Sequence, residues 1–175
     1  AAVILPGFIE LSREVDSKKL SRTKRERLYR TIYEKAVSIG IGIVDHLEID
    51  RVNILNASLL SMAMAVRNLS PGPDYLIVDG LFKVPMGLPQ KAVPKGDALS
   101  LSVGCASIIA KVTRDRIMDR HHEDDPRYGL GQHKGYPTKA HRAAIAEYGH
   151  SFIHRKSFKG VSETVFGGGR HGHQH

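Results

Sequence analysis

Hydrophobic and polar positions repeat along this chain with two different periods, and each period predicts a different kind of element. Short apolar runs at residues 1–5 and 75–78, each followed closely by Pro or Gly, are typical of buried strands, and residues 90–93 are expected to form another short strand. Isoleucines alternate with small residues over 39–43, which is also the period of a strand. The sequence therefore predicts four strands.

Between these runs, apolar residues recur every three or four positions, which is the period of a helix. Thr23, followed three residues later by Glu26, has the pattern of a capping box at the start of the first helix. The segment 129–138 contains three Gly and one Pro and is expected to be a loop. The predicted helices cover residues 23–36, 53–69, 101–122 and 140–148. Strands and helices alternate, and an α/β fold follows.

The last fifteen residues have a different character. Three consecutive glycines, Gly167 to Gly169, precede a tail of Arg, Gly, Gln and three His without an apolar anchor. We expect residues 1–160 to form one domain and residues 161–175 to be disordered. The alternating histidines of this tail could bind a transition metal, but a solvated tail is the favoured interpretation.

Charge narrows the class of partner. The 175 residues include 26 Lys and Arg against 18 Asp and Glu, and the net charge of +8 favours a polyanion such as nucleic acid. A basic domain with no nucleic-acid role stays open on charge alone. The single Cys105 excludes an intramolecular disulfide, and no apolar run is long enough to span a membrane, so we expect a cytoplasmic protein without a membrane partner.

Two acids have positions that suit metal-dependent hydrolysis of nucleic acid. Asp79 ends the apolar run 75–78, and Asp97 follows Lys95 and Gly96. A carboxylate at the carboxyl end of a buried strand is rigidly placed at the crevice of an α/β sheet, and Mg²⁺ prefers oxygen ligands. The local alternative is that Asp79 and Gly80 form a turn.

A basic segment around Tyr136 adds a possible contact to a nucleic-acid strand. Lys134 and Tyr136 lie close together in the segment 132–138, where an amine can contact phosphate and the aromatic ring can stack on a sugar or base. Lys95, beside Asp97, offers a second phosphate contact.

Seven short stretches together resemble one family, the type 2 ribonucleases H, and most closely bacterial ribonuclease HII. They occur in the family's order and extend over residues 1 to about 160. The stretches are 16–20 (DSKKL), 53–55 (NIL), 77–80 (IVDG), 95–97 (KGD), 106–115 (ASIIAKVTRD), 133–138 (HKGYPT) and 154–158 (HRKSF).

The resemblance implies a ribonuclease H-like mixed sheet flanked by helices, with a C-terminal helical extension. It also implies a monomeric endonuclease that uses Mg²⁺ or Mn²⁺, cuts the RNA strand of RNA–DNA hybrids and nicks duplex DNA at embedded ribonucleotides, a step of DNA repair. Asp79 and Asp97 are similar to the third and fourth catalytic carboxylates, Tyr136 to the tyrosine that packs on the sugar, and Lys18 to a backbone contact. For Asp115 an ion pair on the helix surface is favoured.

One part of the family's pattern has no counterpart in this sequence. The resemblance implies a strand ahead of Ala1 with an adjacent Asp-Glu pair and a Gly-Arg-Gly turn, and implies that this strand is central in the sheet. Glu10, Glu14 and Asp16 do not follow a buried strand and cannot replace the pair. We therefore expect an N-terminally incomplete and inactive copy of the enzyme or, alternatively, a basic remnant that binds nucleic acid without cutting it.

Overall fold

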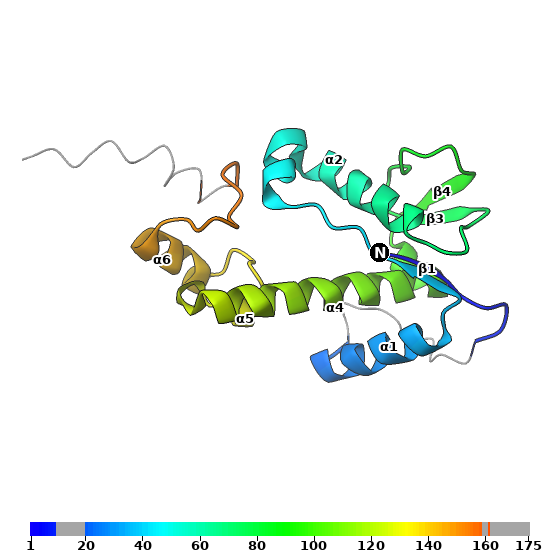
Figure 1. Ribbon diagram of the computed structural model, residues 1–175, viewed down its shortest axis with the longest axis horizontal. Coiled ribbons are helices and arrows are strands. Elements are labelled where there is room, and N and C mark those ends of the chain that lie inside the picture. Colours follow the sequence, from blue (N-terminus) through cyan, green and yellow to red (C-terminus); the bar gives the residue numbers. More distant parts are fainter. Residues whose placement is uncertain (10–19, 159–160, 162–175) are drawn as a thin grey trace, which may run out of the picture. The chain divides into compact units, whose positions relative to one another are not determined.

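The computed structural model describes residues 1–9, 20–158 and 161 (Figure 1). The described residues fall into two compact units, each considered by itself. Unit 1 comprises Ala1–Val44 and Ile54–Arg114, and unit 2 comprises Asp45–Asn53 and Asp115–His175. Lys18, Glu10, Glu14 and Asp16 lie outside the described residues.

Unit 1 contains four strands arranged as two separate two-stranded sheets. Strand β1 (Ala2–Ile4) pairs antiparallel with β2 (Ser38–Gly40), and β3 (Leu76–Asp79) pairs parallel with β4 (Gln90–Val93). All four predicted strands are confirmed, although β2 ends before Ile41 and Ile43. Both kinds of pairing occur, as expected for a mixed α/β architecture.

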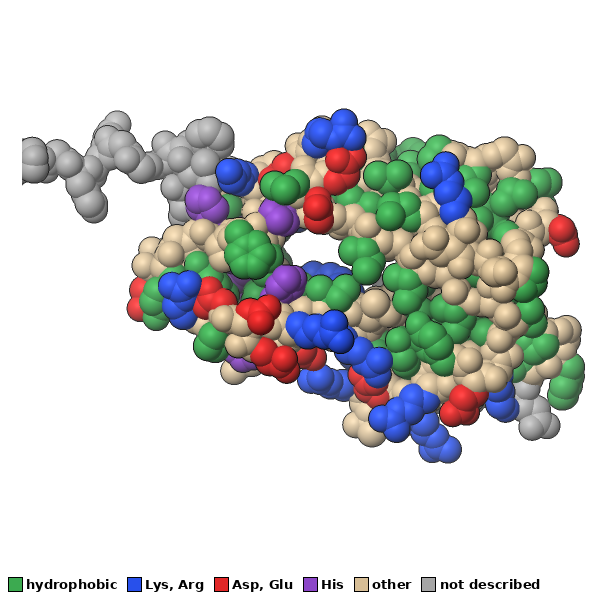
Figure 2. All heavy atoms as spheres, in the orientation of Figure 1, with side chains coloured by type: hydrophobic (Ala, Val, Ile, Leu, Met, Phe, Trp, Pro, Cys, Tyr) green, Lys and Arg blue, Asp and Glu red, His purple; other side chains and the backbone are tan. Residues whose placement is uncertain are grey.

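Helix α1 (Arg22–Lys35) lies close to its predicted position but starts at a different cap. The side chain of Ser21, not Thr23, accepts a hydrogen bond of 3.3 Å from the Lys24 N–H group. The predicted capping box is therefore wrong: Thr23 already lies inside the helix, and the third helical residue after Ser21 is a lysine. Exposed Lys and Arg side chains lie along α1, and Figure 2 shows them in blue.

Helix α2 (His46–Arg67) begins seven residues earlier than predicted and is interrupted at Asn53. Asn53 has a positive φ of 69°, so the segment consists of two helices that meet at a kink, and only the second belongs to unit 1. Helix α4 (Leu101–Asp124) begins where predicted and ends two residues later than predicted, and its first fourteen residues belong to unit 1. The short α3 (Gly96–Leu99) precedes it.

Two apolar clusters hold unit 1 together. In the first, the buried Ile32 of α1 packs with Cys105 and neighbouring residues of α4, and burial raises the pKa of the Cys105 thiol to about 11. In the second, Val66 of α2 and Leu69, which follows α2, cluster with Leu76 of β3. Each cluster contacts β1 from a different side, which places this strand between the two layers.

Glycine permits the closest approach of β2 to α2. A Cβ atom added at Gly40 would lie 1.9 Å from the Ala65 carbonyl oxygen, and one at Gly42 would lie 1.9 Å from the Ser61 carbonyl oxygen. These positions accept no side chain while the backbones remain in place.

Unit 2 is helical. It contains the end of α4, the 3₁₀ helix η1 (Pro126–Tyr128), α5 (Leu130–His133) and α6 (Lys139–Tyr148), around a core that includes Tyr128, Ile145 and Val161. The predicted loop 129–138 therefore holds a one-turn helix, since Gly129 and Lys134 both adopt left-handed conformations that start and end it. Val161 is buried, and residues 162–175 of the predicted tail lie outside the described residues. Among the helices described, none is long and apolar enough to cross a membrane.

Candidate active site

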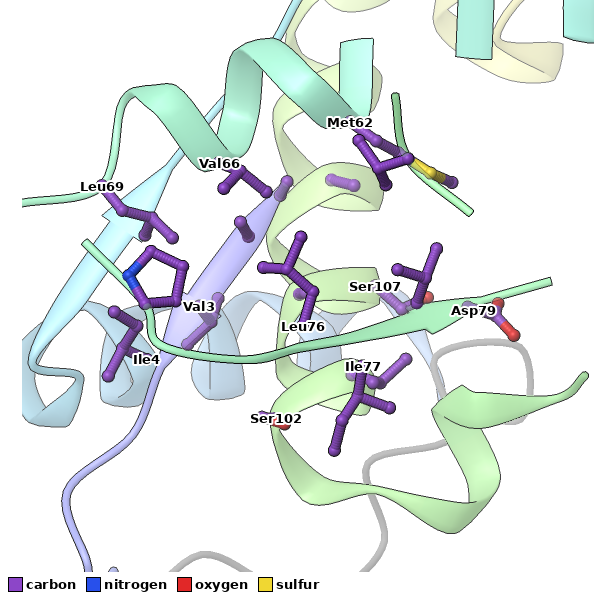
Figure 3. A pocket seen from close by; sticks show the side chains of 18 of the residues that line it. Val3, Ile4, Met62, Val66, Leu69, Leu76, Ile77, Asp79, Ser102 and Ser107 are labelled. Atoms are coloured by element: carbon purple, nitrogen blue, oxygen red, sulfur yellow. The ribbon is translucent and has the colours of Figure 1, made fainter. Parts of the chain in front are cut away.

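Asp79 occupies the carboxyl end of β3, as predicted, but the strand is only half buried. Leu76 and Val78 point into the α2 cluster, whereas Ile77 is 47% exposed and Asp79 lies at the surface. The prediction of a fully buried strand is wrong, because burial alternates along β3: Leu76 and Val78 are buried, and Ile77 and Asp79 are exposed. Successive side chains of a strand point to opposite faces, so the Asp79 side chain points away from the face that carries Leu76 and Val78 (Figure 3).

The main chain beside Asp97 holds the Asp79 carboxylate. The Gly96 N–H group donates a hydrogen bond of 2.8 Å to Asp79 Oδ1. Gly96 is buried, and a Cβ atom there would lie 3.3 Å from Val103 Cγ1 and 3.5 Å from Asp79 Cα. Lys95, with a positive φ of 58°, turns the chain into this position at the start of α3. The structure thus brings the two predicted catalytic acids together through the residue between Lys95 and Asp97.

Asp97 itself is buried, with 4% of its surface exposed. Together with Asp79 it offers carboxylate oxygens, the donors that a hard divalent cation prefers. Residues 1–9, 20–158 and 161 contain no group of three or more His, Cys, Asp or Glu able to hold a metal ion. The donor chemistry of these two acids fits a hard divalent cation.

Tyr136 lies in unit 2 on a turn between α5 and α6. Its N–H group donates to the His133 carbonyl oxygen at 2.9 Å, and its own carbonyl oxygen accepts from the Thr138 N–H group at 2.8 Å. The Tyr136 side chain is 54% exposed. An aromatic ring is therefore presented at the surface from a turn that backbone hydrogen bonds hold.

A chain of histidines supports the same turn, and its geometry fixes each tautomer. A carbonyl oxygen only accepts, so His141 Nδ1 donates to Tyr136 O at 3.1 Å and His141 Nε2 is left as an acceptor. His154 Nε2 then donates to it at 3.0 Å, which leaves His154 Nδ1 to accept from the N–H and hydroxyl groups of Ser151. Both rings are neutral in this arrangement.

Burial agrees with that assignment. Desolvation lowers the pKa of His141, and the His133 ring, which stacks on it at a centroid distance of 4.4 Å, adds to the effect. Desolvation, followed by repulsion from His141, His150 and His46, lowers the pKa of His154 to about 4. The relay from Ser151 to Tyr136 is therefore a set of neutral hydrogen bonds at neutral pH.

Lys134 does not present its amine to solvent. The residue is 7% exposed, and its ammonium pairs with Asp119 of α4 and donates to the Gly131 carbonyl oxygen at 2.6 Å. The expectation of a phosphate contact at Lys134 is corrected in this respect: the left-handed turn at Lys134 directs the side chain back onto the α4 surface. Lys95, in contrast, is exposed.

Three features, one in unit 1 and two in unit 2, were missed from the sequence. The first is the hydrogen bond that the Gly96 N–H group donates to Asp79, for which the sequence offered only the signal of a glycine next to an acid. The histidine relay joins His133, His141 and His154, whose spacing carries no recognisable period. Asp50 accepts hydrogen bonds from the N–H groups of Lys156 and Ser157, more than a hundred positions away.

Comparison with known proteins gives the family. The family model described as Ribonuclease HII matches residues 10–161. The chain belongs to the ribonuclease HII family. It is 53% identical over 165 residues to the ribonuclease HII of Geobacter metallireducens, a match that covers 94% of this chain and 78% of the relative. The ribonuclease HII of Geotalea uraniireducens is 52% identical, with 94% and 76% covered.

Solved structures confirm the fold. The ribonuclease H2 of Pyrococcus horikoshii superposes with a TM-score of 0.72 at 24% identity, over 87% of this chain and 80% of the other. The ribonuclease HII in a complex with PCNA from Archaeoglobus fulgidus gives a TM-score of 0.64 at 26% identity, over 86% and 79%. The resemblance drawn from the sequence is thereby confirmed, and family membership places the chain among the ribonucleases, a class of hydrolases.

Proposed function

We propose that the Asp79 and Asp97 site is that of an endonuclease which hydrolyses the RNA strand of RNA–DNA hybrids and nicks duplex DNA at embedded ribonucleotides. The observation that carries the proposal is the Gly96 N–H group, which holds the Asp79 carboxylate beside Asp97 at the end of β3. Membership of the ribonuclease HII family supports the reaction class. Removal of ribonucleotides from DNA in the cytoplasm is the corresponding cellular role.

Asp79 and Asp97 would hold the Mg²⁺ or Mn²⁺ ions on which this chemistry depends. Bound divalent ions supply a metal-activated water and stabilise negative charge on the phosphate oxygens. The hydrogen bond from Gly96 fixes the rotamer of Asp79, so this oxygen ligand is oriented before any metal arrives. The half-exposed strand leaves the carboxylate open to the approaching phosphodiester.

Nucleic-acid contacts are proposed for Lys95, Tyr136 and Lys18. Lys95 is exposed next to Asp97, and Tyr136 presents its ring from a braced turn suited to stacking on a sugar. We assign Lys134 to this turn rather than to phosphate, because its ammonium is already paired with Asp119. For Lys18, a contact to the nucleic-acid backbone is proposed from the family resemblance alone.

The test is a nicking assay on a duplex with one embedded ribonucleotide and Mg²⁺ or Mn²⁺. Two acids seldom complete a two-metal site, so we expect the 175-residue chain alone to show no cleavage. A form extended ahead of Ala1 by a strand with Asp-Glu and Gly-Arg-Gly should nick, and Asp79→Asn or Asp97→Asn in that form should lower the rate at least about 100-fold.

Asp74→Asn is the matched control, since Asp74 is an exposed acid just before β3 and lies outside the proposed site. Its nicking rate should equal that of the unsubstituted extended form. Strong cleavage by the unextended chain that disappears in Asp79→Asn would show that other acids complete the site and would contradict the first expectation.

A second candidate function is binding to nucleic acid without cleavage. The net charge of +8 favours it, and so does the finding that the described residues contain no group of three or more His, Cys, Asp or Glu able to hold a metal ion. A salt titration tests both candidates, because affinity for a hybrid duplex should fall steeply as salt rises. Affinity that is independent of salt would contradict phosphate recognition altogether.

A further inference from the structure

Helix α1 carries a large share of the positive charge of this chain. Its fourteen residues include six Lys and Arg and two Glu, a net charge of +4, whereas all 175 residues together carry +8. Half of the net charge therefore lies on a single helix of unit 1. Such a concentration of charge calls for a local explanation.

The helix packs with one face and presents the other to solvent. Ile32 of α1 is buried against a cluster that includes Ile108 of α4. Lys24, Arg27 and Arg30 are exposed, and Figure 2 shows the Lys and Arg side chains of α1 in blue. Because they are three residues apart, each follows the last by about 4.5 Å along the helix axis and about 60° around it. These three side chains form a continuous row, which we call the basic stripe.

Helix stability does not explain these cations. The N-terminus is the positive end of the helix dipole, where acids stabilise a helix and cations destabilise it. The first turn of α1 has no acid and contains Arg22, Lys24 and Arg25. Like charges three or four residues apart also repel one another. The sequence therefore places positive charge where it opposes formation of the helix, which points to a role outside the helix.

The basic stripe also has no acidic partner within the described residues. No ion pair there involves Lys24, Arg27 or Arg30. Glu34 is exposed one turn beyond Arg30, and even these two side chains form no ion pair. Lys134, in contrast, is buried against an acid. The charge of the stripe is thus available to a partner outside the chain.

We propose that the basic stripe binds the phosphate backbone of duplex nucleic acid, as a contact surface additional to the Asp79 and Asp97 site. A straight row of cations matches a regular row of phosphates. With a rise of about 1.5 Å per residue, α1 is about 21 Å long and can follow about six base pairs at about 3.4 Å each. The choice of nucleic acid as the partner rests on the proposed function, whereas the arrangement of charge does not.

This surface contacts phosphates and reads no base, so it adds affinity without adding sequence preference. The length of duplex that the chain holds is then set in part by α1, and the position of cleavage is set by the acids. A duplex without any ribonucleotide should bind to the stripe as well as a cleavable one does.

The experiment measures binding of the full chain to a fluorescein-labelled DNA duplex of about 30 base pairs without ribonucleotides, long enough to cover α1 several times over. Fluorescence anisotropy is recorded at several salt concentrations in the absence of divalent metal. The stripe variant combines Lys24→Gln, Arg27→Gln and Arg30→Gln. Each lost phosphate contact lowers the slope of log affinity against log salt by about 0.9, so the slope should fall by about 2.7. Affinity at about 0.1 M salt should fall at least about tenfold.

The matched control combines Arg67→Gln, Lys83→Gln and Lys91→Gln, three exposed cations of unit 1 that lie on separate segments. It removes the same three charges, so any effect of net charge alone is equal in the two variants. The control should lower the salt slope by less than about 1. Urea denaturation should show the stripe variant at least as stable as the unsubstituted chain, since repulsion along α1 is relieved.

Equal salt slopes in the stripe variant and the control would overturn the proposal, because net charge would then suffice. A stripe variant that is less stable than the unsubstituted chain would assign these cations to the fold and would also overturn it. If the stripe variant loses affinity as expected while the extended form fails to nick, the proposed endonuclease is contradicted and the contact surface stands.

Discussion

The two units hold their candidate functional residues by different means. In unit 1, Asp79 is placed by a strand and a main-chain N–H group, and the surrounding elements pack through apolar side chains and bare glycines. In unit 2, Tyr136 is braced by polar side chains, with a histidine relay on one side and the buried Lys134 and Asp119 pair near it. The arrangement in unit 1 therefore depends on close packing, and the arrangement in unit 2 depends on the protonation state of its histidines.

The largest effect is expected where unit 1 has no room for a side chain. Gly40→Ala places a Cβ atom 1.9 Å from the Ala65 carbonyl oxygen, so β2 and α2 must separate. We expect the free energy of unfolding to fall by about 3 kcal/mol, measured by urea denaturation. Gly87→Ala is the control, because nothing lies within 4 Å of its added Cβ. Equal stability of the two variants would show that packing at Gly40 is not limiting.

The next effect is a pH dependence confined to unit 2. His154 has a folded-state pKa of about 4 against an ordinary value of 6.5, so between these values the unfolded chain binds more protons than the folded chain. The stability of unit 2 should therefore be complete above pH 6.5 and fall by up to about 3 kcal/mol towards pH 4.

Hydrogen exchange of unit 2 amides at pH 7.5 and pH 5 measures this change. His154→Gln removes the titrating ring and should flatten the pH response, whereas His121→Gln should leave it unchanged. A response that persists in His154→Gln would assign the pH dependence to another group. Unit 1 amides around β3 should respond less than those of unit 2, which tests the comparison directly.

A smaller effect on stability is expected to distinguish Lys134 from Lys95, both of which the sequence predicted as contacts to nucleic acid. Lys134→Met leaves Asp119 without its buried partner and should lower the free energy of unfolding by about 2 kcal/mol. Lys95→Met should leave stability unchanged but reduce the salt slope of hybrid binding by about 1. A fall in salt slope for Lys134→Met, with stability intact, would restore Lys134 as a phosphate contact.

The smallest effect concerns the start of α1. Ser21→Ala removes the side chain that caps the helix and should lower the free energy of unfolding by about 1 kcal/mol. Thr23→Ala should cost less, because Thr23 lies inside the helix and no longer serves as its cap. Thermal unfolding of both variants decides between the observed cap and the capping box predicted from the sequence.

Local patterns were sufficient for most elements. The positions of β1, β3, α4 and α6 follow from the spacing of apolar residues, since a helix or strand is specified within its own segment. The family also followed from short stretches in order along the chain, among them those around Asp79 and Asp97. The interruption of α2 at Asn53 and the one-turn helix α5 could not be predicted from local patterns. Each depends on left-handed backbone angles, which the residues at these positions can adopt but do not have to adopt.

The sequence by itself determined the α/β class and the family of this protein, and it indicated Asp79 and Asp97 as candidate site residues. The tertiary structure alone decided that Gly96 orients Asp79, that Lys134 is buried against Asp119, and that three histidines brace the Tyr136 turn. It also decided that residues of β1 and β3, which belong to separate two-stranded sheets, line one cavity (Figure 3). These features depend on contacts between residues far apart along the chain, and such contacts leave no local period to read.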